Sequence, residues 1–250
     1  MCCLFGFYDY GGTLSSKQKN RMIAALAAAS EVRGIDATGI AYCMNGHLSV
    51  YKRPLPAHWM RFRIPEQAAA VMGHTRMTTQ GSEYRNYNNH PFSGKAGQPF
   101  ALAHNGNIVN SELLRRHLEN KGSLFQSTSD SEILAHLIKK ETRYHDRPRI
   151  FSIIDALNML EGAFAFLIMT ANRIYACRDK YGLRPLSIGK LGDGWVVSSE
   201  TCAFDVLGAE FVRDVEPGEI VTIDKQGIRS RDYSMYKRHE MCSMEYIYFA

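Results

Sequence analysis

Short apolar runs and amphipathic stretches alternate along the chain, and their periods predict which segments are strands and which are helices. Residues 3–8 (CLFGFY) are apolar without interruption, which is typical of a buried strand. Residues 37–45 and 47–52 flank Asn45-Gly46, a strong signal for a β-hairpin. The other runs that predict strands are residues 69–74, 100–104, 163–170, 173–178, 186–190, 194–198, 219–223 and 228–233.

Four stretches instead place apolar residues three or four positions apart, as on one face of a helix. The first spans residues 17–32, with Ile23 and Leu26 on one side. It ends before Gly34, because glycine commonly terminates a helix. The other three predicted helices span residues 110–120, 129–140 and 150–160.

Two polar stretches have a more specific interpretation. Ser129 and Glu132 match a capping box at the start of the third predicted helix, where each side chain would satisfy a free backbone N–H. Residues 78–98 are rich in Asn, Gly, Ser and Tyr. A connection of this length without structure is uncommon, so we interpret it as a functional loop.

Many short strands, with the helices grouped in two places, favour an α+β fold of largely antiparallel sheets packed against helices. No internal repeat, low-complexity tract or linker interrupts the sequence. We therefore expect residues 1–250 to form a single domain.

Composition places the chain among ordinary globular proteins. It has 250 residues, of which 45% are hydrophobic and 22% charged. The net charge of +5 comes from scattered basic residues, so a nucleic-acid interface is not indicated. No apolar run is long enough to span a bilayer, and the N-terminus lacks the pattern of a signal peptide. We expect a cytoplasmic protein that binds no membrane.

The six cysteines and nine histidines do not suggest a metal site. No C-x-x-C pair occurs, and no pair of histidines has the spacing of metal ligands. Without an export signal, the cysteines are expected to be reduced thiols. We predict neither a bound metal nor a cofactor.

Cys2 is the first candidate for catalysis. Aminopeptidases remove an initiator Met before a small residue, and this removal would place a thiol and a free α-amine on Cys2. The α-amine has an ordinary pKa of about 7.7–8.0, so near neutral pH a useful fraction can accept the thiol proton. An N-terminal residue can thus serve as nucleophile and base at once. The alternative is a buried structural cysteine.

Three further stretches hold residues with complementary chemistry. Arg76 follows an apolar strand, where its guanidinium could bind a carboxylate through two hydrogen bonds or simply form a surface ion pair. Asn105 and Gly106 could form an oxyanion hole or an ordinary turn. Asp130 could pair with an ammonium group or stabilise the first turn of a helix. Together these groups fit an amino acid with a side-chain amide, glutamine or asparagine.

The sequence resembles the class II glutamine amidotransferases, which are glutaminases with an N-terminal nucleophile, over essentially its whole length. The second half is most similar to the glutaminase domain of phosphoribosylpyrophosphate amidotransferases. The first half, with EVRGIDATGI and GHTRMTTQG…NNHPF, is equally similar to other members. The matching runs of the second half are ALAHNGNIVN, GSLFQSTSDSEILAHLIK, GLRPLSIG, VVSSETCAFDVLGA and VEPGEIVTID.

The resemblance implies a fold and a set of roles. The family fold is a four-layer αββα sandwich of two mainly antiparallel sheets. Cys2 matches the nucleophile that attacks the amide carbonyl of glutamine, through a thioester, and Asn105 and Gly106 match the oxyanion hole.

The remaining roles concern glutamine binding. Arg76 matches the residue that binds the α-carboxylate, and Asp130 matches the one that holds the α-ammonium. Thr79 lies in the loop that covers glutamine, where we expect it to contact the substrate. Arg33 and Gly34 match a supporting pair near the nucleophile.

The acceptor half of an amidotransferase is not evident. The sequence contains no Asp-Asp pair for a ribose diphosphate and no phosphate-binding G-x-x-x-x-G-K-[ST] loop. Cys242 matches an iron–sulfur ligand of some relatives without its partner cysteines, so we expect a free thiol. We expect a glutaminase domain that supplies ammonia to an acceptor synthase on a separate chain.

Three points stay open at this stage. The same groups could cleave another amide, or bind glutamine as a sensor without turnover. The sequence also leaves open whether the protein is a homo-oligomer.

Overall fold

Two antiparallel sheets form the centre of the molecule. The computed structural model describes residues 2–79, 81–144, 148–240 and 242–248. Sheet A has seven strands in the order β11-β9-β10-β1-β4-β2-β3, and sheet B has six in the order β13-β12-β8-β7-β6-β5. The strands of sheet A are β1 (Cys3–Tyr8), β2 (Ala37–Met44), β3 (His47–Arg53), β4 (Ala70–Arg76), β9 (Ser187–Leu191), β10 (Gly194–Ser198) and β11 (Glu210–Asp214). The strands of sheet B are β5 (Phe92–Ala96), β6 (Gln98–Ile108), β7 (Gly162–Thr170), β8 (Arg173–Arg178), β12 (Glu219–Asp224) and β13 (Gly227–Asp232).

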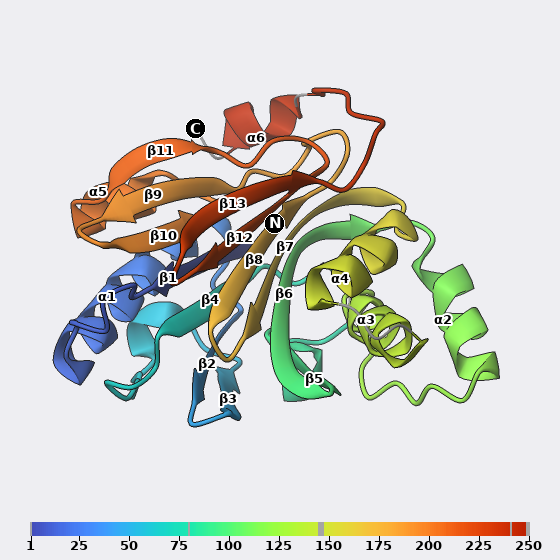
Figure 1. Cartoon of the computed structure of the whole chain (residues 1–250), viewed down its shortest axis with the longest axis horizontal. Helices are drawn as coiled ribbons and strands as arrows, with labels where there is room; N and C mark the ends of the chain where they lie inside the picture. Colours follow the sequence, from blue (N-terminus) through green and yellow to red (C-terminus); the bar gives the residue numbers. More distant parts are fainter. Residues whose placement is uncertain (1, 80, 145–147, 241, 249–250) are drawn as a thin grey trace.

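Helices cover the outer face of each sheet (Figure 1). α1 and α5 lie against sheet A, whereas α3 and α4 lie against sheet B with α2 beside α3. The helices are α1 (Ser16–Ala29), α2 (Ser111–Asn120), α3 (Glu132–Tyr144), α4 (Arg149–Asn158), α5 (Cys202–Leu207) and α6 (Ser243–Tyr248). The result is the four-layer αββα sandwich that the resemblance predicted, and this prediction is confirmed.

The central position of β1 explains its uninterrupted apolar sequence. β1 pairs with β10 on one side and with β4 on the other. Leu4 and Tyr8 point into the core between the two sheets, while Phe5 and Phe7 pack in the core on the α1 side. Because successive side chains of a strand face opposite ways, a strand between two cores must be apolar at every position.

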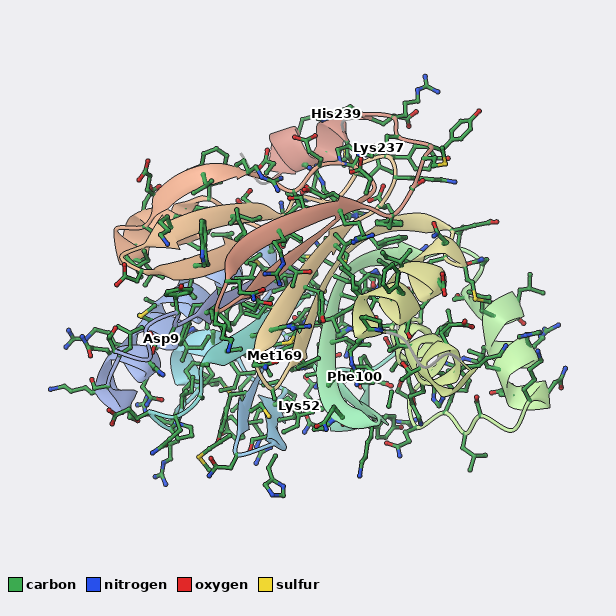
Figure 2. The ribbon with its side chains drawn as sticks, in the orientation of Figure 1. Asp9, Lys52, Phe100, Met169, Lys237 and His239 are labelled. Carbon is green, nitrogen blue, oxygen red and sulfur yellow. The ribbon has the colours of Figure 1, made fainter. Side chains whose placement is uncertain are left out.

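Small side chains line the space between the sheets. Ala101 and Ala103 of β6 meet this core together with Ala165 of β7, and the larger Met169 fills the space farther along. Met169 lies in the core between the sheets, whereas Phe100 lies in a second core between sheet B and the helices α3 and α4 (Figure 2). Alanines on the inner faces allow the two sheets to approach closely, which brings the ends of β1 and β6 near one another.

The predicted capping box at Ser129 is wrong. Glu132 is the first residue of α3, and its carboxylate accepts hydrogen bonds from the backbone N–H groups of Gln126 and Ser127 at 2.9 and 2.7 Å. The Ser129 hydroxyl accepts a bond from the Ser131 N–H instead. The loop before α3 uses Glu132 to satisfy its own backbone, so the carboxylate is not available for the helix.

A capping box occurs at α1, where the sequence analysis did not place one. The Ser15 side chain accepts a bond from the Gln18 N–H, and the Gln18 side chain accepts one from the Ser15 N–H. The helix therefore begins at Ser16, one residue before the predicted start.

The predicted loop 78–98 is wrong in its second half. Residues Phe92–Ala96 form β5, which pairs with β6 at the edge of sheet B. β6 is also longer than predicted and extends to Ile108, so Asn105 and Gly106 lie inside a strand rather than at its end. The elements without a sequence signal were α5, β11 and α6.

No helix in the described part of the chain combines the length and the apolar character that a membrane crossing requires.

A buried ion pair ties α1 to the rest of the fold and generates a prediction. The Lys19 ammonium lies 2.9 Å from Asp9 and donates to the carbonyl oxygens of Glu66 and Ala68, and both charged side chains are buried. Lys19→Ala should lower the free energy of unfolding by about 3–5 kcal/mol, because it leaves Asp9 buried without its partner. Urea denaturation measures this loss. Lys17→Ala, an exposed position of the same helix, should stay within about 0.5 kcal/mol; equal effects at both positions would refute the assignment.

Candidate active site

The residues expected to act together do converge. Cys2, Arg76, Thr79, Gly106 and Asp130 line one cavity. Cys2 lies directly before β1, Arg76 ends β4, Gly106 lies in β6, and Asp130 lies two residues before α3. The neighbouring strands β1 and β4 and the facing strand β6 thus supply the walls.

Cys2 is half-buried, and its thiol is held close to the backbone. The Sγ atom donates to the Met77 carbonyl oxygen over 3.6 Å. Burial raises the pKa of this thiol, although the guanidinium of Arg76 opposes the rise. The thiol is therefore protonated near neutral pH and requires a base before it can attack. The predicted removal of Met1, which would create that base, concerns a residue outside those that the structure describes.

Arg76 is buried and held in place by Asn89. Its Nη1 donates to the Asn89 Oδ1 over 2.6 Å, while the Asn89 Nδ2 donates to the Glu83 carbonyl oxygen. Burial lowers the pKa of Arg76, but the ordinary pKa of a guanidinium is so high that the group stays charged at neutral pH. The group is thus fixed as a cation at the cavity wall.

Asp130 supplies the opposite charge. Its carboxylate accepts hydrogen bonds from the Ile108 N–H at 2.9 Å and the Ser131 hydroxyl at 3.2 Å, and His104 lies 3.7 Å away. Burial raises the pKa of Asp130, but His104 and these hydrogen bonds outweigh it and hold the value at about 2. The cavity therefore presents a fixed anion as well as a fixed cation.

Asn105 and Gly106 have different positions in the site. Gly106 lines the cavity with a φ of +146°, and a Cβ there would lie 2.0 Å from the Ala163 carbonyl oxygen, so no other residue fits. Asn105 is 1% exposed and lies between two lining residues, His104 and Gly106. Among the described residues, neither polar atom of its side chain has a hydrogen-bond partner. A buried amide without a partner is costly, which indicates a group kept for a ligand.

Arg33 and Gly34, the expected supporting pair, have side chains or backbone in two different surroundings. Gly34 packs against the backbone joining Arg76 and Met77, where a Cβ would approach within 2.4 Å. Arg33 lines a separate cavity, and its buried guanidinium pairs with Glu200 and with Glu245 of α6. Gly34 thus fixes the wall of the site directly, whereas Arg33 joins α6 to the core.

The sequence analysis missed a group of histidines beside the site. His90 and His104 line the cavity, and the ring of His74 lies 4.2 Å from that of His90. The His74 Nε2 is 3.1 Å from the His104 carbonyl oxygen, and the His104 Nδ1 is 2.8 Å from the Ser131 hydroxyl. Burial lowers the pKa of His74 to about 3 and lowers that of His90 well below its ordinary value.

These histidines were tested in the sequence only for the spacing of metal ligands. The positions of His74 and His104 within apolar strand segments, in MGHTR and ALAHNG, were the available signal, whereas His90 lies in a polar segment and had none. In the part of the chain that the structure describes, no group of three or more His, Cys, Asp or Glu side chains is arranged to hold a metal ion.

Comparison with known proteins assigns the class. Residues 74–206 match the family model of the glutamine amidotransferase domain, and the chain belongs to this family. The matched range includes Arg76, Asn105, Gly106 and Asp130.

Sequence relatives show which members of the family the chain resembles. The chain is 49% identical to the amidophosphoribosyltransferase of Bacillus subtilis (strain 168) over 181 residues, which cover 72% of this chain and 37% of the relative. It is 37% identical to that of Mycobacterium tuberculosis (strain H37Rv) over 230 residues, which cover 87% of this chain and 42% of the relative. The chain thus spans well under half the length of these two relatives.

Solved structures agree with this similarity. The structure of glutamine phosphoribosylpyrophosphate amidotransferase from B. subtilis, complexed with ADP and GMP, matches with a TM-score of 0.86 at 39% identity. The match covers all of this chain and 53% of that one. A second structure, of the allosteric regulatory enzyme of purine biosynthesis, matches with a TM-score of 0.87 at 37% identity. The fold is therefore that of an N-terminal-nucleophile amidotransferase domain.

The contact between Arg76 and Asn89 generates a prediction. Asn89→Ala removes the acceptor that orients the Arg76 guanidinium, so the KM for glutamine should rise on the order of tenfold, from the loss of one charged hydrogen bond. Steady-state kinetics measure KM and kcat separately. Asn158→Ala, which removes a side-chain bond to the Tyr233 carbonyl oxygen far from the cavity, is the matched control. An unchanged KM in Asn89→Ala would show that Asn89 does not position Arg76.

Proposed function

We propose that this protein hydrolyses the side-chain amide of glutamine to glutamate and ammonia. The observation that supports this function best is the meeting of a thiol, a fixed cation and a fixed anion in one cavity, with a buried amide next to it. A free amino acid carries a carboxylate and an ammonium on one carbon. Arg76 and Asp130 complement these two charges, which leaves the side-chain amide to reach Cys2.

Binding comes first in the proposed reaction. The Arg76 guanidinium binds the α-carboxylate, while the Asp130 carboxylate binds the α-ammonium. Thr79, at the cavity wall, contacts the bound substrate. Because both charged groups are already held by their neighbours, little reorganisation accompanies binding.

The chemical steps follow from the state of the Cys2 thiol. After removal of Met1, the α-amine of Cys2 takes the thiol proton, and the sulfur attacks the amide carbonyl. The oxyanion of the tetrahedral intermediate accepts bonds from the Asn105 amide and the Gly106 N–H. The protonated amine then gives its proton to the leaving nitrogen, so ammonia departs and a thioester remains. Water hydrolyses the thioester to glutamate and restores the thiol.

The ammonia is proposed to serve an acceptor site outside these 250 residues, on an acceptor synthase. The absence of an Asp-Asp pair and of a phosphate-binding loop from the sequence supports this part. The two relatives named above are called amidophosphoribosyltransferases and are about twice as long. We also propose a cytoplasmic location, which the free thiols of all six cysteines support.

Substitutions at the charged groups should separate binding from turnover. Arg76→Ala and Asp130→Ala should each raise the KM for glutamine strongly, because loss of one partner of a desolvated ion pair costs about 2–5 kcal/mol. Asn105→Ala should instead lower kcat by roughly 10²–10³, since its amide is needed most when the oxyanion forms. Measurement of glutamate release over a range of glutamine concentrations gives both constants. If all three variants lowered only kcat, these roles would be wrong.

The identity of the base can be tested through residue 1. Insertion of Lys between Met1 and Cys2 prevents removal of Met1, so Cys2 keeps an amide nitrogen that cannot accept a proton. This variant should fold yet be nearly inactive, and intact mass verifies the retained Met. In the processed wild type, kcat/KM should fall as the pH drops below the pKa of the α-amine, ordinarily about 7.7–8.0, because only the neutral amine accepts the thiol proton. Full activity of the insertion variant would exclude the amine as base.

A further inference from the structure

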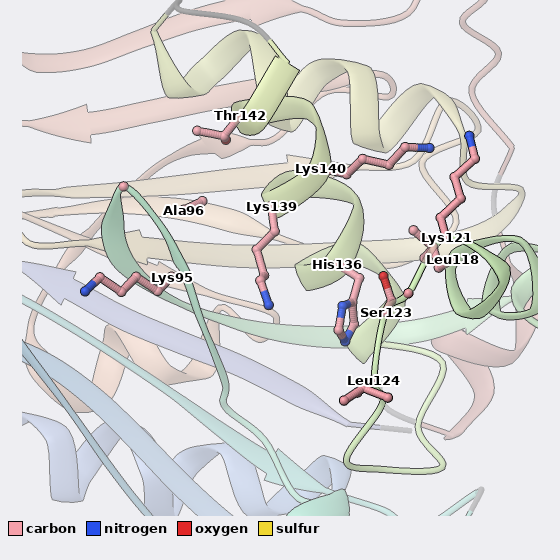
Figure 3. A pocket seen from close by; sticks show the side chains of 12 residues that line it. Lys95, Ala96, Leu118, Lys121, Ser123, Leu124, His136, Lys139, Lys140 and Thr142 are labelled. Atoms are coloured by element: carbon pink, nitrogen blue, oxygen red, sulfur yellow. The ribbon is translucent and has the colours of Figure 1, made fainter.

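A wide pocket with a basic lining lies on the helical side of sheet B, apart from the catalytic cavity. It is bounded by the β5–β6 hairpin, the turn after α2 and the length of α3, and has a volume of about 670 Å³ (Figure 3). Its basic residues are Lys95, Lys121, Lys139, Lys140 and His136. This size is typical of a site for a small molecule.

The four lysines reach the pocket from three separate segments. Lys95 comes from β5, Lys121 follows α2, and Lys139 and Lys140 lie on α3. Within the described ranges, none of the four forms an ion pair with a carboxylate, in contrast to Lys19, which pairs with Asp9. Figure 3 shows Lys140 and Lys121 extending toward the same side of the pocket. Four ammonium groups therefore line this pocket, and the described residues pair none of them directly with a carboxylate.

Basic side chains lie close to one another at this side of the pocket. The Lys140 ammonium lies 3.4 Å from the His117 Nε2. Burial and the adjacent Lys121 side chain lower the pKa of Lys140, while Glu141 opposes the shift. Lys121, followed by slight burial and Lys140, lowers the pKa of His117 as well. The charge of Lys121 thus disfavours the protonated form of Lys140 unless an anion binds beside the two side chains.

We propose that this pocket binds a phosphorylated small molecule with two or more linked phosphates. Lysine is a common partner of phosphate, and three or four ammonium groups around one hollow match several negative charges close together. The Ser123 hydroxyl adds a polar group to the lining. The concave shape favours a small ligand over a nucleic-acid strand, which would require an extended basic stripe.

The pocket adjoins the loop that contains Asp130. His136 lines the pocket and lies 3.5 Å from Glu132, whose carboxylate accepts from the N–H groups of Gln126 and Ser127. A ligand that contacts His136 would thus touch the neighbour of Glu132, the residue whose carboxylate holds the loop before Asp130. The binding proposal does not depend on the proposed glutaminase reaction, since binding is measured directly.

Calorimetric titration with inorganic triphosphate tests the proposal at constant ionic strength. The purified protein should bind triphosphate, and Lys121→Gln/Lys140→Gln should bind it at least tenfold more weakly. Lys17→Gln/Lys225→Gln removes the same charge from two exposed lysines outside the pocket and should bind like the wild type. Thermal unfolding of all three proteins verifies that they are folded, and Lys139→Gln supplies an independent variant of the same lining. Equal affinities of the two double variants, or no binding by the wild type, would overturn the site.

Further titrations identify the chemistry of the ligand. ATP and triphosphate of equal affinity would support recognition of the phosphate chain alone, whereas tighter binding of ATP would support a nucleotide. Adenosine that binds while triphosphate does not would overturn the proposal. Saturating glutamine should leave triphosphate bound, and its displacement would place the anion in the catalytic cavity instead.

Discussion

The close approach of the two sheets determines where the chemistry of this protein can occur. Alanines of β6 and β7 face the inner core, so β1 and β6 come near enough for Cys2 and Gly106 to line one cavity. Pairing within sheet B adds a further requirement at position 106, where any side chain would collide with the carbonyl oxygen of Ala163 on the neighbouring strand β7. A larger residue on either inner face would separate the nucleophile from the proposed oxyanion hole. Packing between the sheets is thus a condition of the catalytic arrangement.

A second constraint concerns charge. Two opposite charges lie at the cavity, the buried Arg76 and the partly buried Asp130, and each is held by polar neighbours. The buried rings of His74 and His90 beside them are neutral, because burial lowers the pKa of both rings. The site therefore concentrates its charge in two groups, which suits a substrate with one carboxylate and one ammonium. The thiol remains uncharged until a base acts on it.

The helix α3 links the catalytic cavity to the proposed anion pocket. Its first residue, Glu132, organises the loop before Asp130, and its later residues, Lys139 and Lys140, form part of the basic pocket. His136 lies between these groups on the same helix. Because a helix is rigid along its length, a ligand at one end is structurally connected to the substrate loop at the other. The packing of α3 against sheet B fixes the position of both regions relative to that sheet.

Much of the fold and five of the residues that line the cavity could be predicted from local sequence. Apolar periodicity predicted β1 and the helices α1 to α4, because the period of the buried positions depends only on the local backbone, and Asn45-Gly46 predicted the β2–β3 hairpin. The motifs around Arg76, Asn105 and Asp130 were sufficient to suggest an amino-acid amide as substrate. Local sequence could not predict the position or the role of a residue whose partners are distant in the sequence.

The tertiary structure decided the rest. Asn105 and Gly106 lie inside β6 because β7 continues to pair with the strand up to Ile108. Glu132 binds the preceding loop instead of capping its helix, and His90 enters the site from a segment predicted to be a loop. In each case the partner is remote in sequence or the competing hydrogen bond forms only in the folded chain. The sequence by itself determined which groups were available, and long-range packing determined which of them meet.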